Sequence, residues 1–296
     1  MAAAISQLPS SDLSHFSRKQ HLAQTFEAYR AELDDENALR ESLIILSRSI
    51  TQLSKKLIFH LHRGATLPTP AQRQKNLEQG KGKEREIALL FEQIRDKLRK
   101  ANKRSGMRKG GKGEEEREVR EEEEEDGWEW GFWKWRKSVT PGLEEYIEGL
   151  SFMWYLEHGS LVSLEDVQKA VSDENGQPYL VVTPEDYILG MSDLTGELMR
   201  YATNALGTGD HETPLAVCDF VRTVKTHFDA INPDSLRQLS KKQDETQRSL
   251  EKIEKVCYAL RLRLIEFADR PDILAQMAKR ALDDVADKGG SGPAAE

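Results

Sequence analysis

The chain has 296 residues, of which 38% are hydrophobic, 32% are charged and 7% are aromatic, and its formal net charge is −8. Net acidity on its own speaks against a nucleic-acid partner, and no stretch approaches the roughly 18 apolar residues of a membrane span. Two cysteines, Cys218 and Cys257, provide neither a disulfide framework nor the spacing of a zinc site. The first residues lack the basic start and apolar run of a signal peptide, so we expect an intracellular, soluble protein.

Apolar residues recur at helical spacing along most of the chain, and runs of Val, Ile and Thr that would favour strands are nearly absent. We expect a disordered tail over residues 1–18, followed by long helices over about 16–63 and 70–103. A glycine and two prolines separate these helices. Helices of this length are typical of a bundle whose elements run along most of the molecule.

The composition changes sharply after the second helix. Residues 95–113 hold nine Lys or Arg against one acid, and residues 114–126 hold ten acids against two Arg. Such blocks cannot bury enough apolar surface to offset the entropy of the chain. We therefore predict a mobile insert over 104–127. Its basic half could serve as a nuclear-localisation or RNA-tethering patch, or the whole insert could be a solvated linker.

A proline lies inside the third helical pattern, which runs over residues 128–159. Two interpretations follow from it. Either Thr140 caps a helix whose first residue is Pro141, or a longer helix bends at Pro141.

The remaining sequence predicts four more helical segments. A short amphipathic segment follows Ser163, and a loop covers residues 172–182. Thr183 then has the character of a helix N-cap, because a proline and two acids follow it. This helix ends at Gly207. Two final helices are expected over about 211–231 and 235–267. The predicted fold is all-α: a single bundle of about seven helices over residues 19–285, interrupted by the insert, with a second disordered tail over 286–296.

Two of these helices each carry a pair of acids at helical spacing. Glu145 and Glu148 are three residues apart, and Asp193 and Glu197 are four apart. Two such helices could place their carboxylates together in a bundle, as in di-metal carboxylate proteins. Carboxylate oxygens suit Mg²⁺, which can activate water and neutralise charge on a phosphodiester. Acid pairs are nevertheless common in so charged a chain, and most of them lie on solvated faces.

Glycines beside these acids favour the functional interpretation. Gly190 and Gly196 lie within the helix that carries Asp193 and Glu197, and each costs a helix interior about 1 kcal/mol relative to alanine. Glycine lets another backbone or a bulky polyanion approach closely. We therefore infer that this helix has a lower helix propensity at Gly190 and Gly196 so that another backbone or a polyanion can approach its acids.

Three segments have a character that is specific to one family. They read LSRSITQLSKKLIFHLHR near the start, VTPEDYILGMSDLTGELMRYATNALGTGDHETPLAVCDFVR in the middle and SLEKIEKVCYALRLR near the end. Together they resemble the translin family. The resemblance covers roughly residues 25–267 and excludes the tails and the insert.

The resemblance implies a function as well as a seven-helix subunit. Such a chain would assemble with translin into a hollow hetero-oligomer, expected to be an octameric shell, which acts as a Mg²⁺-dependent endoribonuclease on single-stranded RNA, with DNA as a second ligand. Family roles are the clearance of passenger-strand fragments in RNA silencing and the processing of transfer RNA precursors, in the cytoplasm and the nucleus. The alternative is a non-catalytic scaffold that stabilises translin and binds nucleic acid.

The resemblance also assigns roles to residues. Catalytic acids of the family lie in GLxEYxE and DLTGE segments, which here read GLEEYIE and DLTGE. They correspond to Glu145, Glu148, Asp193 and Glu197, which are expected to be catalytic and to hold Mg²⁺. A translin partner would supply much of the charge that binds RNA, and this chain adds basic residues of its own. The residues expected to contact RNA are Lys56 and Arg63 on the first helix, with Arg48 and Lys55 beside them, and Arg200 one turn beyond Glu197.

Overall fold

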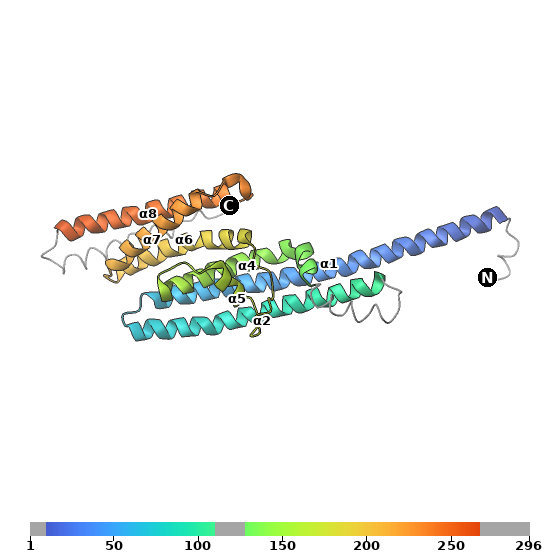
Figure 1. Ribbon diagram of the computed structural model, residues 1–296, viewed down its shortest axis with the longest axis horizontal. Coiled ribbons are helices and arrows are strands. Elements are labelled where there is room, and N and C mark those ends of the chain that lie inside the picture. The colour runs from blue at the N-terminus through green and yellow to red at the C-terminus, as the bar shows by residue number, and fades with distance from the viewer. Residues whose placement is uncertain (1–9, 110–127, 267–296) are drawn as a thin grey trace, which may run out of the picture.

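The computed structural model describes residues 10–109 and 128–266, which form an elongated bundle (Figure 1). Within these ranges there are seven α-helices, one 3₁₀ turn and no strand, so the predicted all-α class and number of helices are confirmed. The elements are α1 (Ser10–Ala65), α2 (Pro70–Lys109), α4 (Trp128–His158), α5 (Leu164–Ala170), α6 (Pro184–Gly207), α7 (Glu212–Asp229), η2 (Pro233–Ser235) and α8 (Leu239–Glu266).

Two predicted boundaries are wrong. Helix α1 begins at Ser10, inside the stretch expected to be a tail, and α2 runs to Lys109, six residues into the expected insert. Each extension prolongs a helix that already exists, and propagation needs no new nucleus. The rest of the insert and the expected tail over 286–296 lie outside the described residues.

The two helices that carry the acid pairs, α4 and α6, lie in the middle of the bundle. Helix α1 packs against both α2 and α4, α4 packs against α6, and α7 and α8 cover α6 from the other side (Figure 1). The N-terminal part of α1 projects beyond the other helices. The core between them is aliphatic and aromatic, and its largest fully buried side chains include Phe91, Phe132, Tyr146 and Phe152.

Helix α4 continues through Pro141, so the interpretation in which Thr140 caps a new helix is wrong. The hydroxyl of Ser47 on α1 lies beside the proline. It accepts a hydrogen bond from the backbone N–H of Gly142 (3.0 Å) and donates one to the carbonyl of Val139 (3.1 Å). A Cβ on Gly142 would lie 2.6 Å from the Ser47 carbonyl oxygen, so a side chain there would keep α1 and α4 apart.

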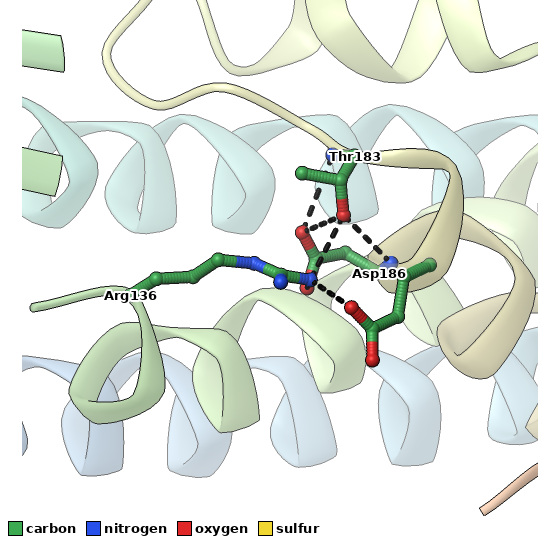
Figure 2. A network of polar contacts seen from close by, with 4 residues as sticks. Arg136, Thr183 and Asp186 are labelled. Carbon is green, nitrogen blue, oxygen red and sulfur yellow. Dashed lines mark hydrogen bonds and ion pairs between the residues drawn. The ribbon is translucent and has the colours of Figure 1, made fainter. Parts of the chain in front are cut away.

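A polar network around the buried Asp186 fixes the start of α6 against α4 (Figure 2). Thr183 caps α6 as predicted and forms a capping box with Asp186. The Arg136 guanidinium of α4 donates to Asp186 (2.9 Å), Glu185 (2.8 Å) and Thr183 (2.9 Å). Asp186 is fully buried. Since a buried carboxylate without a partner costs several kcal/mol, this contact sets the position of α6 relative to α4.

About one turn after Asp186 along α6, Gly190 lies so close to α4 that no side chain fits between the two helices. A Cβ on Gly190 would lie 2.8 Å from the Glu144 carbonyl oxygen and 2.8 Å from Ile147 Cβ. Around Gly196, by contrast, a Cβ would meet no atom within 4 Å. The first glycine therefore permits close helix packing, whereas the second leaves open space beside the acids.

We predict opposite effects for alanine at the two glycines. Gly190→Ala should lower the free energy of unfolding by about 1–3 kcal/mol, because the helices must separate. Gly196→Ala should raise it by up to about 1 kcal/mol, because it gains helix propensity without a clash. Urea unfolding followed by circular dichroism measures both, and equal effects would show that Gly190 does not set the spacing of α4 and α6.

Candidate divalent-metal centre

The packing of α4 on α6 brings the four acids singled out in the sequence into one electrostatic neighbourhood. Each of them is half-buried. Burial, and then the charges of Asp193, Glu145 and Glu197, raise the pKa of Glu148 to about 8. In the described part of the chain, no hydrogen bond or ion pair joins Glu148 to another residue. Glu148 is therefore influenced by three other carboxylates and makes no ion pair with a basic side chain in the described ranges.

The other acid of α4 contacts a lysine of α1. Glu145 Oε2 lies 3.5 Å from Lys55 Nζ, and the lysine side chain is 66% exposed. Burial raises the pKa of Glu145, and the charge and hydrogen bond of Lys55 oppose that effect. Because Lys55 is largely solvated, its contact with Glu145 stabilises the fold by no more than about 1 kcal/mol.

Both acids of α6 have basic partners from other helices. Lys242 Nζ on α8 lies 2.5 Å and 2.7 Å from the two carboxylate oxygens of Asp193. Glu197 pairs with Nε2 of His62, a buried ring on α1 that packs 4.5 Å from the Phe152 ring. Burial acts to raise the pKa of Glu197, but His62 and Arg200 outweigh it, so the pKa is lowered.

Sequence reasoning missed three residues of this neighbourhood. The first is Glu144: burial, and then the charge of Asp186, raise its pKa to about 7. In the sequence, only its position directly before Glu145 pointed to a place near the site. His62 carries no local signal, because its partner Glu197 is 135 residues away. Lys242 carries no local signal, because its partner is 49 residues away.

The donor set fits a hard divalent cation, although the side chains are not gathered around one point. In the part of the chain that the structure describes, no group of three or more His, Cys, Asp or Glu side chains has the arrangement of a metal site. Three of the four acids contact Lys55, Lys242 or His62 instead. The chemistry still fits, because carboxylate oxygens are the ligands that Mg²⁺ prefers, and the charge of Lys242 only partly offsets the burial and repulsion that raise the pKa of Glu148.

The basic residues expected on the first helix all lie on its surface. Lys56, Arg63, Arg48 and Lys55 are exposed. The Arg63 guanidinium lies over the ring of Phe59, 6.0 Å from its centroid, and Phe59 is 62% exposed. Arg200 is also exposed and lies 3.4 Å from Glu197. The outer face of α1 thus combines positive charge with an accessible aromatic ring.

A family model described as the Translin family matches residues 38–106 and 118–264. The chain belongs to the translin family. The residues between the two matched ranges lie within the expected insert. None of the helices in the described ranges is long and apolar enough to cross a membrane.

Individual members of the translin family also match this chain. The chain is 32% identical to Translin-associated protein X of Rattus norvegicus over 257 residues, which is 80% of this chain and 78% of the relative. It is 26% identical to the homologue in Schizosaccharomyces pombe, over 82% and 89% of the two chains. Identity to Translin of Homo sapiens is 32%, but over only 41% of this chain and 53% of that protein.

Two solved structures share the fold. The crystal structure of apo-NeC3PO has a TM-score of 0.55 and 15% identity, and covers 79% of this chain and 96% of its own. The structure of an AfC3PO–duplex RNA complex has a TM-score of 0.53 and 18% identity, over 81% and 98%. These values show a common helical architecture.

The raised pKa of Glu148 predicts a pH-dependent stability for the metal-free protein. Unfolded, this carboxyl titrates near 4.5, and folded it titrates near 8. Between these values the unfolded chain has lost a proton that the folded chain keeps, so stability falls as pH rises from about 4.5 to 8. With a chelator present, Glu148→Gln should raise Tm by about 3 °C or more at pH 8.5 and by little at pH 5. A gain that is equal at both pH values would contradict this assignment.

Proposed function

We propose that this chain is the catalytic subunit of a Mg²⁺-dependent endoribonuclease that it forms with translin. The observation that carries the proposal is that Glu145, Asp193 and Glu197 act electrostatically on Glu148, a half-buried acid of α4 that makes no ion pair among the described residues. Half-buried carboxylates repel one another, and a divalent cation is the simplest charge that would relieve the repulsion.

The four acids would have two different roles. Glu145, Glu148 and Asp193 would hold the cation, which supplies an activated water and neutralises charge on the phosphodiester when bound. Glu197 is held by His62 through one carboxylate oxygen. It would therefore keep a fixed orientation in which it completes the ligand set or positions a water.

Single-stranded RNA is the substrate class that best suits the surface of α1. Lys56 and Arg63 would contact phosphates, and Phe59 between them would stack on an unpaired base. Lys55 links this face to the acids through Glu145. The relative AfC3PO has been captured with duplex RNA, which supports RNA as the class of ligand. Arg200 beside Glu197 would contact the strand near the site of cleavage.

Translin is the proposed partner, and the projecting part of α1 offers a surface for a neighbouring subunit. Leu22, Phe26, Tyr29 and Leu33 are each at least 57% exposed, and their spacing of four, three and four residues places them in one apolar stripe. An uncovered stripe of this kind is typical of an interface. We further propose an octameric shell that acts in the cytoplasm and nucleus on passenger-strand fragments and transfer RNA precursors.

A second candidate is a scaffold that binds nucleic acid without cutting it. The observation that favours it is the pairing of Glu145, Asp193 and Glu197 with Lys55, Lys242 and His62. Such pairs could simply join α1 to α4 and α6, and α8 to α6. Glu148 distinguishes the candidates, because a purely structural role would leave no reason to bury an acid without a partner.

Replacing the acids tests the proposal. In the complex with translin, Asp193→Asn or Glu148→Gln alone should reduce cleavage of a labelled single-stranded RNA at least about 100-fold, and the double variant should add little, because the ligands act as a unit. Glu197→Gln should cause a smaller loss. RNA binding should persist, because fewer negative charges face the phosphates.

The matched control is Glu165→Gln, an 81% exposed acid on α5, which should leave cleavage unchanged. Normal cleavage by Asp193→Asn in Mg²⁺ would favour the scaffold.

Substitution of the α1 aromatic tests the RNA surface. Phe59→Ala should weaken binding of single-stranded RNA about 5- to 100-fold, as expected when one base loses its stacking partner. Leu89→Ala on α2, where the side chain is similarly exposed, should have no effect. Fluorescence anisotropy with a labelled oligonucleotide measures both, and equal affinities would place the RNA elsewhere.

A further inference from the structure

One ion pair among these acids joins Asp193 to Lys242. The ammonium lies 2.5 Å from one carboxylate oxygen and 2.7 Å from the other, so neither oxygen is left without a charged donor. The Lys242 side chain is only 16% exposed and that of Asp193 is 34% exposed. This pair is therefore far less screened by water than the contact between Lys55 and Glu145.

The charge of Lys242 acts on both helices that carry the acids. It contacts Asp193 on α6, and it also opposes the rise in the pKa of Glu144 and Glu148 on α4. A single ammonium thus partly offsets the repulsion among three carboxylates, which is the electrostatic task that a bound divalent cation would perform.

Lys242 and a divalent cation compete for the same carboxylate. A Mg²⁺ ion bonds carboxylate oxygens at about 2.1 Å, so on either oxygen of Asp193 it would be within about 5 Å of the ammonium. Positive charges so close together in a half-buried site repel strongly. Cation binding at Asp193 therefore requires the lysine to leave.

The lysine can leave without movement of its helix. Its side chain is a flexible four-carbon stem that ends in a point charge. The next residue, Gln243, donates hydrogen bonds to the carbonyls of Phe228 (3.0 Å) and Ile231 (3.1 Å). These contacts tie the start of α8 to the end of α7, so rotation of the Lys242 side chain alone can clear the carboxylate.

We propose that Lys242 is an internal counter-ion of the candidate metal centre: its ammonium holds Asp193 while the site lacks a divalent cation, and is displaced when the cation binds. The proposal rests on the proposed function, since it assumes that Asp193 is a metal ligand. It accounts for the absence of a gathered ligand set among the described residues, and it makes the lysine a determinant of how tightly the cation binds.

Metal affinity tests the proposal without reference to cleavage. The probe is Mn²⁺, which suits the same oxygen ligands as Mg²⁺, titrated into the full chain co-purified with translin and followed by electron paramagnetic resonance. Lys242→Met removes the competing charge and should tighten binding about tenfold or more. Lys242→Arg keeps the charge and should not tighten it.

The neighbouring lysine provides the matched control. Lys241 is 78% exposed and, among the described residues, pairs only with Glu245 at 3.7 Å. Lys241→Met therefore removes the same charge outside the site and should change affinity less than twofold. Lys242→Met should also show a larger rise in Tm on addition of Mn²⁺ than the unchanged protein. If Lys242→Met can be purified only when Mn²⁺ is present, the cation has replaced the lysine, as proposed.

Each contrary result has a distinct meaning. Unchanged or weaker Mn²⁺ binding by Lys242→Met, with Asp193→Asn abolishing both binding and cleavage, would overturn the counter-ion role and leave the nuclease intact. A Lys242→Met protein that is insoluble with and without Mn²⁺ would make the lysine purely structural and would also overturn it. If the unchanged complex and Asp193→Asn bind Mn²⁺ equally and neither cleaves RNA, the proposed function itself fails.

Discussion

The candidate site depends on the close approach of α4 and α6 at Gly190. A Cβ there would lie within 2.8 Å of the α4 backbone at Glu144, so only glycine allows the two helices their present separation. Arg136 fixes the same pair of helices at the buried Asp186. Together these contacts determine how closely the acids of one helix face those of the other, and hence how strongly they repel.

Repulsion among these carboxylates lowers the stability of the fold, and basic side chains offset it at some of the acids but not at all of them. Asp193 and Glu197 have basic partners on α8 and α1, whereas Glu148 has none in the described part of the structure and keeps a raised pKa. A fold selected for stability alone would replace such an acid with an apolar or amide side chain. Half-buried acids with a raised pKa occur often at binding and catalytic sites, which supports the proposed function.

Local patterns in the sequence were enough to predict that seven helices form, although two of their boundaries were wrong. Thr183, followed by proline and acids, caps α6 as expected, and Ser163 caps the short helix that follows it. The acids of α4 and α6 were also recognisable, because each pair lies within one helix and within a family segment. His62 and Lys242 were not, because their partners lie on distant helices and packing alone brings them together. The two glycines looked equivalent in sequence, and only the structure separates the packing role of Gly190 from the open surroundings of Gly196.

The proposed function requires the acids of α4 and α6 to form one divalent-cation site. The most direct measurement is a crystal structure of this chain with translin in Mn²⁺, with anomalous scattering recorded at the manganese absorption edge. We expect an anomalous peak between α4 and α6 within bonding distance of Glu148 and Asp193, with Lys242 turned away from Asp193. A structure at the same Mn²⁺ concentration with no peak there, and with Lys242 still on Asp193, would contradict it.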